Sequence, residues 1–281
     1  MFQYAYALLI KKITNDEVKL DYTAYNLLEM DKIRRPRITE FSLSLQAASQ
    51  EDIERVCLLK HTGNPNSFFY KLKIFADAKI NKKYFFEQNR AYIPPEKLKN
   101  YDYFDGYWQS WRYVNEVLDE LKNDFTPKVE VSLKTSETKK KIENSNSVFV
   151  GVRRGDYLEN KKHYGNFGIK YYLKSMEKIE EKIENPVYYI FSNDVEWCKE
   201  NLQFGKRNII YRENADQVSD FEELILMTNC KSAIICNSTF NWWGAQLIKN
   251  SNKIVCCPSK WFFDDAPIDI VPKEWIRIND N

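Results

Sequence analysis

The residues with the clearest chemical potential follow an apolar segment, Ser147 to Val152, whose composition predicts a buried strand. Two arginines and a carboxylate come directly after it, in the run Arg153 to Asp156. Open parallel sheets bind ligands just beyond the carboxyl ends of their strands, and the planar donors of arginine match phosphate oxygens. The run therefore indicates a phosphate-bearing ligand. The run is explained equally well if one arginine only forms an ion pair with the carboxylate of Asp156 or another acid and fixes the turn.

A second polar strand end carries Asp194, which follows the predicted strand Val187 to Phe191 and precedes a helix that begins at Val195. A carboxylate is favoured at a helix N-terminus, where the free N–H groups and the helix dipole attract it. Asp194 could instead accept hydrogen bonds from a base such as guanine. Taken alone, the residue favours the capping interpretation.

The third strand end carries two adjacent hydroxyl groups. Ser238 and Thr239 follow Asn237 and the predicted strand Ser232 to Cys236, and a helical pattern begins after them. Free N–H groups at a helix N-terminus bind anions, and the hydroxyl groups would add donors. Ordinary capping explains one hydroxyl group but not a cluster beside two tryptophans, so the segment favours a phosphate-binding site.

Several familiar nucleotide and metal motifs are absent from the sequence. It contains neither GxGxxG after a strand nor GxxxxGK[ST], which argues against a dinucleotide dehydrogenase and a P-loop NTPase. No two aspartates are separated by a single residue, and the two histidines, His61 and His163, are too far apart to suggest zinc. Arginine and helix N-termini would therefore have to balance the charge of a diphosphate leaving group. We expect no metal and no separate cofactor.

Composition places the chain among folded proteins. The 281 residues are 43% hydrophobic and 29% charged, with a formal net charge of +2, which is not typical of a disordered or membrane-spanning chain. So weak a charge argues against nucleic acid as the main partner. The six cysteines show neither disulfide nor metal spacing, so we expect reduced thiols in a cytoplasmic protein. Peripheral contact with the inner face of a membrane stays open.

The order of elements predicts an α/β fold of two domains. From residue 146 onward, short apolar segments alternate with helical ones, as in a doubly wound parallel sheet covered by helices on both faces. Residues 1–145 should form a second α/β domain that ends in a polar linker or exposed helix, and residues 146–281 the sheet domain with its tail. In the first domain we expect a strand at Val18 to Asp21 and a helix at Trp111 to Lys122. Because the chain opens on a helix, the strand and ligand loop that normally precede it are predicted to be missing.

Five segments, in order along the chain, resemble motifs of glycosyltransferase family 11, the bacterial-type α-1,2-fucosyltransferases. The first resembles the end of Gly-Gly-Leu-Gly-Asn-Gln-Met-Phe-Gln-Tyr-Ala, and the second resembles Gly-Tyr-Trp/Phe-Gln-Ser. The others resemble His-x-Arg-Arg-Gly-Asp-Tyr, Phe-Ser-Asp/Asn-Asp and Asn-Ser-Thr-Phe-Ser-Trp-Trp-Gly. The five segments are Met1 to Ala5, Gly106 to Ser110, Arg153 to Tyr157, Phe191 to Trp197 and Asn237 to Gly244.

The resemblance implies a GT-B-like fold of two Rossmann-like domains, with GDP-fucose bound in the C-terminal one. It implies metal-independent transfer of fucose, with inversion, to a galactose hydroxyl of a glycan or lipid-linked oligosaccharide, in surface polysaccharide or O-antigen synthesis. By position, Arg153 would hold the β-phosphate and stabilise the charge that develops there. Arg154 would shape the motif beside the nucleotide, and Asp194 would contact guanine. The nucleotide would also be bound by Asn237, Ser238 and Thr239.

Two assignments have alternatives. Asp156 has the chemistry of a base that deprotonates the acceptor hydroxyl, but it could equally buttress the arginines. Trp108 and Gln109 could line an acceptor groove, because aromatic rings stack on sugars, whereas core packing explains them at least as well.

The sequence departs from the family pattern in two places. Gly151 stands where the family often has histidine, which removes a polar contact near the phosphates. The segment Gly-Gly-Leu-Gly-Asn-Gln is missing ahead of Met1. The alternative functions are therefore a truncated protein that binds GDP or glycans without catalysis, and a fucosyltransferase with another linkage or acceptor.

Overall fold

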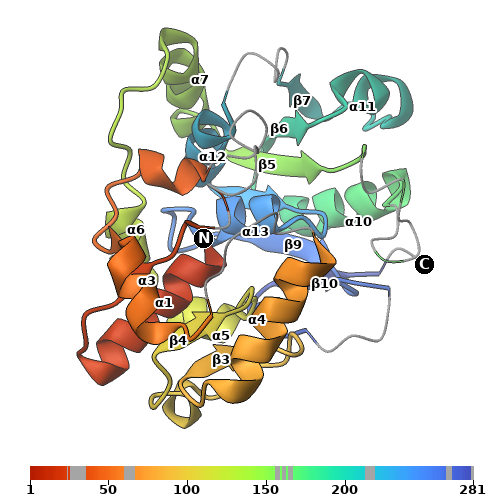
Figure 1. Cartoon of the computed structure of the whole chain (residues 1–281). Coiled ribbons are helices and arrows are strands. Elements are labelled where there is room, and N and C mark those ends of the chain that lie inside the picture. The colour runs from red at the N-terminus through yellow and green to blue at the C-terminus, as the bar shows by residue number, and fades with distance from the viewer. Residues whose placement is uncertain are drawn as a thin grey trace. The chain divides into compact units, whose positions relative to one another are not determined.

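The computed structural model describes residues 1–23, 25, 36–59, 67–155, 159, 163, 167–212, 219–263 and 268–279 (Figure 1). Two compact units make up the chain. The N-terminal unit consists of Met1–Val129 and Ala266–Ile270, and the C-terminal unit of Glu130–Asp265 and Val271–Asn281. No helix among the described residues is both long and apolar enough to cross a bilayer.

The C-terminal unit is built on a six-stranded sheet in which every neighbouring pair is parallel. The strand order is β10-β9-β8-β5-β6-β7. The chain thus starts in the middle of the sheet, moves outward through β6 and β7, and then crosses back to β8. This is the order of a doubly wound nucleotide-binding sheet. The strands are β5 (Ser147–Val152), β6 (Val187–Ser192), β7 (Asn208–Tyr211), β8 (Ser232–Ile234), β9 (Val255–Pro258) and β10 (Ile276–Ile278).

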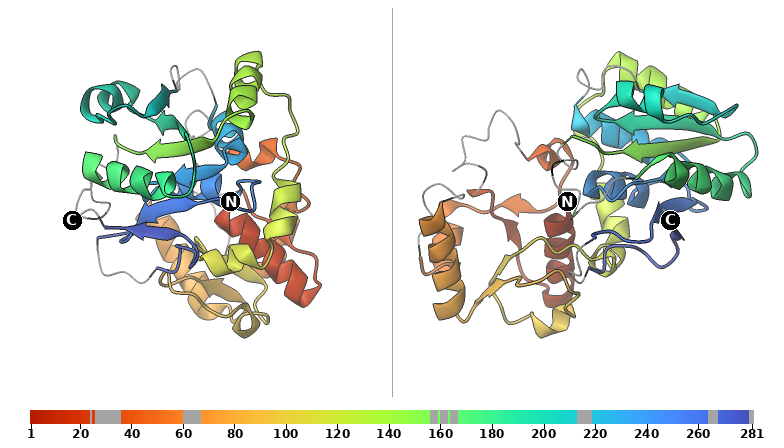
Figure 2. Two further views of the ribbon diagram at one scale, coloured as in Figure 1. Left: turned by 180° about the vertical axis from the view of Figure 1, so that it is seen from behind. Right: turned by 90° about the vertical axis from the view of Figure 1, so that its right-hand side faces the viewer.

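Helices cover both faces of this sheet (Figure 2). Alternate residues of the central strand β5 point to opposite faces, so they contact different helices. Val148 and Val150 pack in one core with residues of two helices, α10 (Ile169–Glu180) and α11 (Val195–Asn201). Phe149 and Gly151 face the other side. There they approach α13 (Thr239–Gln246), which packs on α12 (Asp220–Asn229). The expected α/β class with a doubly wound parallel sheet is confirmed.

The segment between the units forms helix α7 (Leu133–Glu143) and belongs to the C-terminal unit, because it packs against α12. The structure therefore divides the chain at Val129, whereas the sequence predicted the division after residue 145. Ser132 caps α7 by accepting a hydrogen bond from Thr135 N–H, and the Ser132 N–H donates to Glu222. Of the two alternatives that the polar composition predicted, a linker and a helix, the structure contains the helix.

The N-terminal unit combines helices with two pairs of parallel strands, so it is also α/β. β1 (Lys19–Leu20) pairs with β2 (Gln46–Ala47), and β3 (Tyr84–Phe86) pairs with β4 (Tyr103–Asp105). Strand β1 lies within the expected strand Val18 to Asp21. The expected single helix at Trp111 to Lys122 is instead two short helices. The α-helices among the described residues of this unit are α1 (Phe2–Thr14), α3 (Gln50–Val56), α4 (Phe68–Ile80), α5 (Trp111–Asn115) and α6 (Leu118–Asp124).

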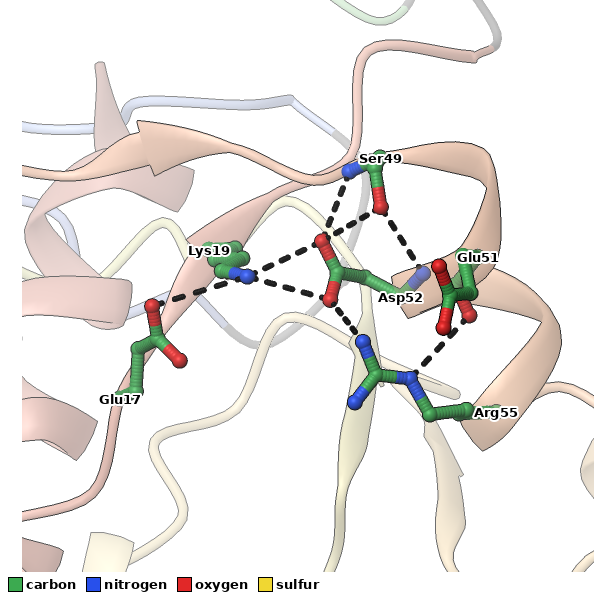
Figure 3. A network of polar contacts seen from close by, with 6 residues as sticks. All are labelled: Glu17, Lys19, Ser49, Glu51, Asp52 and Arg55. Carbon is green, nitrogen blue, oxygen red and sulfur yellow. Dashed lines mark hydrogen bonds and ion pairs between the residues drawn. The ribbon is translucent and has the colours of Figure 1, made fainter.

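A polar network ties β1 to α3 (Figure 3). Ser49 and Asp52 form a capping box at the N-terminus of α3, with each side chain accepting a hydrogen bond from the other residue's backbone N–H. The same Asp52 carboxylate accepts hydrogen bonds from Lys19 Nζ at 3.0 Å and from an Arg55 Nη at 2.7 Å. The hydrogen bond from the Ser49 backbone, followed by those of the Ser49 and Lys19 side chains, holds the pKa of Asp52 well below its ordinary value. Asp52 therefore links strand β1, helix α3 and the turn between β2 and α3.

Candidate active site

The C-terminal unit changes direction between β5 and β8. These strands are neighbours, with Val150 opposite Ile234, but the chain leaves β5 toward β6 and leaves β8 toward β9. The loops after the two strands therefore run in opposite directions from the carboxyl ends, and such a switch point is where doubly wound sheets bind their ligands. The first loop carries Arg153 and Arg154, and the second begins with Asn237 and Ser238. The topology thus brings two of the predicted phosphate-binding segments to one position.

A buried thiol joins these two loops. Backbone N–H groups of Arg153 and Ser238 both donate hydrogen bonds to Cys236 Sγ, and Asn241 Nδ2 donates to the same sulfur at 3.3 Å. Burial raises the pKa of the Cys236 thiol to about 11, although these hydrogen bonds oppose the shift. The residue therefore stays a neutral acceptor that fixes Arg153 beside Ser238. The sequence did not predict this role, because nothing in a single cysteine at the end of an apolar strand distinguishes it from a core residue.

Arg154 is held by its neighbours at the end of β6. Its backbone N–H donates to Asn193 Oδ1 at 2.9 Å, and its Nε donates to Asp194 Oδ2 at 3.0 Å. The guanidinium carbon also lies 3.5 Å from the ring centre of Trp197, a cation–π contact. The Arg154 side chain is only 13% exposed, so these contacts fix it against β6 and α11. Contact between Arg154 and the nucleotide stays a prediction.

Both oxygens of Asp194 serve the protein itself. Oδ1 caps α11 by accepting from the Trp197 N–H at 3.2 Å, and Oδ2 pairs with Arg154. The capping alternative from sequence therefore describes an interaction that the structure contains. Contact between Asp194 and guanine stays a prediction.

Arg153 differs from the arginine that follows it, because its side chain is exposed. The turn after the pair requires glycine at position 155. Gly155 has a φ of +56°, and a Cβ atom there would lie 2.8 Å from Asn193 Nδ2. The turn thus orients two adjacent arginines differently, with Arg154 packed on α11 and Arg153 exposed at the switch point. Asp156, the predicted base, lies outside the described residues.

The N-terminus of α13 follows β8 at the same switch point. Ser238 stands at the N-cap position, yet its side chain makes no capping hydrogen bond, so ordinary capping does not explain it. Thr239 opens the helix and is half-buried. Asn237 is buried, and its Nδ2 donates to the carbonyl oxygen of Trp261 at 2.8 Å. Asn237 therefore braces the segment that follows β9, while Ser238 and Thr239 stand where the first N–H groups of α13 have no partner within the helix.

The glycine that replaces the family's histidine is explained by its contact with α13. A Cβ atom on Gly151 would lie 2.5 Å from Asn241 Cγ, so the Asn241 side chain fills the space that a side chain at position 151 would need. Asn241 itself stands where the family motif has serine. Gly151 and Asn241, which both differ from the family motifs, are therefore in contact, and the larger side chain on α13 fills the space left by the smaller residue on β5.

A buried charge pair lies farther along the same edge of the sheet. Arg212 directly follows β7 and is 6% exposed, and its Nε lies 3.8 Å from Glu223 Oε1 in the first turn of α12. Neither of these atoms has a hydrogen-bond partner among the described residues, nor does Arg212 Nη2. Burial raises the pKa of Glu223 to about 7. Sequence analysis missed this pair, although an arginine placed directly after an apolar strand was an available signal.

The second family motif, Gly106 to Ser110, places a buried tryptophan in the core of the N-terminal unit. Glu87 Oε2 accepts hydrogen bonds from the backbone N–H groups of Tyr107 and Trp108, which fixes Trp108 at a φ of +56°. The indole is 2% exposed and stacks on Tyr6, with ring centres 3.9 Å apart. Core packing therefore accounts for Trp108 in this structure. Contact of Trp108 or the half-buried Gln109 with an acceptor stays a prediction.

The first and second motifs also contact each other inside this unit. Gln3 Nε2 donates to the Gly106 carbonyl oxygen at 2.9 Å. Ser110 caps α5 through the Arg112 N–H, and its hydroxyl donates to Asp269 Oδ2 at 2.9 Å. The two segments that resemble the family in this half of the chain thus have structural roles that the sequence alone did not reveal.

Comparison with known proteins places the chain in a family. The model of glycosyl transferase family 11 matches residues 74–279. An alpha-1,2-colitosyltransferase of Escherichia coli is 30% identical over 99% of this chain and 94% of its own length. The O-antigen biosynthesis glycosyltransferase WbnK of Escherichia coli is 26% identical over 99% and 96%.

More distant proteins match in part. Galactoside alpha-(1,2)-fucosyltransferase 1 of Ateles belzebuth is 28% identical over 50% of this chain and 42% of its own length. A crystal structure of POFUT1 in complex with GDP covers 88% of this chain and 82% of that chain, with 12% identity and a TM-score of 0.38. The chain belongs to glycosyl transferase family 11 and is a glycosyltransferase related to α-1,2-colitosyltransferases and α-1,2-fucosyltransferases.

Proposed function

We propose that this chain transfers L-fucose from GDP-fucose to a galactose hydroxyl of a glycan or lipid-linked oligosaccharide. The product would carry an α-1,2 linkage, and the anomeric centre of fucose would invert. One observation carries the proposal: Arg153 and the N-terminus of α13 meet at the switch point of a doubly wound sheet in a family 11 chain. Surface polysaccharide or O-antigen synthesis in the cytoplasm is the setting we propose.

The proposed chemistry follows from where negative charge develops. As the bond between fucose and the β-phosphate breaks, the sugar becomes oxocarbenium-like and the phosphate gains charge. A guanidinium at Arg153 would stabilise that charge more strongly in the transition state than in the bound substrate. The hydroxyl groups of Ser238 and Thr239 and the first N–H groups of α13 would bind the same diphosphate. Together these groups would perform the charge balancing that a metal ion performs in other transferases.

We assign the acceptor base to Asp156, with a buttress for the arginines as its alternative role. Asp156→Asn separates the two roles. If Asp156 is the base, the substitution should lower turnover by about 10²-fold or more while GDP affinity stays near normal. Loss of GDP binding would assign it the buttressing role instead.

The donor sugar has one specific alternative. The relative that is 30% identical over nearly the whole chain is named a colitosyltransferase, whereas the fucosyltransferase relatives match over half of it. GDP-colitose is therefore the second candidate donor, with the same site and the same role for Arg153.

A transfer assay decides between the donors. The purified chain would be incubated with a galactose-terminated acceptor and either GDP-fucose or GDP-colitose, with EDTA present, and the product linkage read by NMR. The proposal predicts an α-1,2-fucosylated product with inverted configuration and no loss of rate in EDTA. Faster transfer of colitose than of fucose would show that GDP-colitose is the preferred donor. Binding of GDP without transfer of either sugar would identify a protein that binds nucleotide without catalysis.

A further inference from the structure

Helix α4 presents an apolar face that no other described part of the chain covers. Its exposed side chains include five large apolar ones, whereas most other aromatic rings described in the same unit are buried or half-buried. Phe68, Leu72 and Phe75 follow the spacing that aligns residues along one side of a helix. Figure 2 (right) shows α4 at the outer edge of the N-terminal unit, with the strands between it and α1. The five are Phe68 (74% exposed), Phe69 (75%), Leu72 (49%), Phe75 (57%) and Ile80 (60%).

The opposite side of α4 is well anchored, so the exposed face belongs to a fixed helix. Ile74 and Ala78 pack against a buried cluster formed by Ile53, Cys57 and Tyr84. Asp77 is fully buried and accepts hydrogen bonds from two backbone N–H groups, those of Leu58 and Leu59. Ser67 caps the helix by accepting from the Tyr70 N–H. These contacts fix the helix, so the face that carries the exposed rings points to solvent.

Lysines border the apolar face, and no exposed acid interrupts it. Lys71 and Lys73 are exposed on either side of the stripe, and Lys79 lies on the stripe with its Nζ 5.4 Å from the ring centre of Phe75. Lys82 and Lys83 follow directly after the helix and are exposed. The acid of this helix, Asp77, points inward. Because the whole chain carries a formal charge of only +2, this is a local concentration of positive charge.

We infer that this face of α4 docks onto an anionic phospholipid bilayer. Aromatic and aliphatic side chains would enter the boundary between headgroups and acyl chains, and the lysines would extend their ammonium groups to lipid phosphates. An apolar face bordered on both sides by lysines complements a negatively charged, apolar surface. The helix would lie in the plane of the membrane. The inference goes beyond the proposed transfer, because it holds whichever sugar the enzyme transfers.

Vesicle sedimentation tests this surface directly. The full chain would be mixed with vesicles of phosphatidylcholine alone or of phosphatidylcholine with phosphatidylglycerol, and the bound fraction measured. Phe68→Ser with Phe75→Ser should lower the partition coefficient on the anionic vesicles by about 100-fold. Lys71→Gln with Lys73→Gln should lower it by about fivefold per lysine. High salt should weaken binding of the wild-type chain in the same direction.

Matched controls come from α7 and the residues before it. Val129 and Leu133 are exposed apolar residues, and Lys140 and Lys141 are exposed lysines. Val129→Ser with Leu133→Ser, and Lys140→Gln with Lys141→Gln, should leave vesicle binding unchanged.

Three results would overturn the inference. The first is a wild-type chain that stays in solution with anionic vesicles. The second is an equal loss of binding in the α7 controls, which would move the site to that basic helix. The third is a phenylalanine variant that binds vesicles normally but changes the sedimentation coefficient of the free protein, which would make the face a protein interface. Because all the replaced side chains are exposed, thermal unfolding of each variant should match the wild type.

Discussion

Two adjacent arginines have different tasks because different neighbours surround them. Arg154 has a carboxylate, an aromatic ring and a side-chain amide as partners, so using it for a phosphate would break a partly buried ion pair. Arg153 is exposed one residue earlier, where its backbone is fixed by Cys236. The family resemblance implied that Arg153 holds the β-phosphate and that Arg154 shapes the motif beside the nucleotide, and contact of either residue with the nucleotide stays a prediction. Packing against Trp197 is what separates them, and a single sequence does not reveal which ring a side chain will meet.

A residue-scale prediction concerns Glu223. Its pKa is about 7 in the folded chain, against 4.5 ordinarily, because the carboxyl group is buried. Between these values the folded state holds a proton that the unfolded state has lost, so the free energy of unfolding falls as pH rises through this window. The contribution amounts to roughly 3 kcal/mol. Denaturant unfolding at about pH 5 and about pH 8 measures it.

Glu223→Gln should remove this part of the pH dependence, because the amide does not titrate. Glu196→Gln is the matched control, since Glu196 has a side chain that is 79% exposed on α11. It should unfold with the pH dependence of the wild type. An identical slope in the wild-type and Glu223→Gln chains would contradict the assigned pKa.

Long, buried strands and helices were predicted from sequence more accurately than short or exposed ones. Strands β5, β6 and β8 were located from sequence because apolar residues fill strands that are buried on both faces of the sheet. Of the paired strands of the N-terminal unit, only β1 was expected from sequence; β2, β3 and β4 have two or three residues, too few for an alternating pattern to be recognised. The expected helix at Trp111 to Lys122 breaks at Val117, which leaves the helical conformation (φ −131°) and is buried. Tertiary packing of one side chain thus overrides a local helical pattern.

The contact between β5 and α13 gives an element-scale prediction. Gly151→Ala would place a Cβ atom against the buried Asn241, so it should lower stability by about 1–3 kcal/mol, as overpacking does. Asn241→Ser, which restores the family's residue, would open the space, and the double variant should recover most of the loss. Denaturant unfolding of the two single variants and the double variant gives the coupling energy.

Gly168→Ala is the control for this cycle, because nothing lies within 4 Å of a Cβ atom at that position and its φ is not positive. It should leave stability nearly unchanged. Purely additive effects of Gly151→Ala and Asn241→Ser would show that the two departures from the family motif are independent.

For the whole molecule, the chain passes between its two units three times. Residues 266–270 return to the N-terminal unit, where Asp269 accepts hydrogen bonds from Ser110 and Trp111 and pairs with Arg112 at 2.8 Å. The sequence predicted a single division after residue 145, because composition changes there. A segment of five residues is too short to show a change in composition, so the sequence did not predict this return. The partners of Asp269 lie more than 150 residues earlier in the sequence.

A prediction at this scale follows from the contacts of Asp269. Asp269→Ala should lower the stability of the N-terminal unit by roughly 1–3 kcal/mol, since it removes charge-assisted hydrogen bonds. Hydrogen exchange should quicken in peptides that contain α5 and stay unchanged in peptides that contain β5 and β6. Asp119→Ala is the control, because the Asp119 side chain is 94% exposed. Unchanged exchange at α5 would show that the returning segment does not stabilise this unit.

The central claim is that Arg153 and the N-terminus of α13 hold the donor's diphosphate, and turnover of an Arg153→Ala variant tests it most directly. Arg55→Ala, at an exposed arginine on α3, is the matched control. Measured with GDP-fucose and a galactose-terminated acceptor, Arg153→Ala should lower kcat by about 10²–10³-fold and weaken GDP binding, while thermal unfolding stays as in the wild type. The Arg55→Ala variant should keep wild-type turnover. Full turnover in the Arg153→Ala variant would contradict the account.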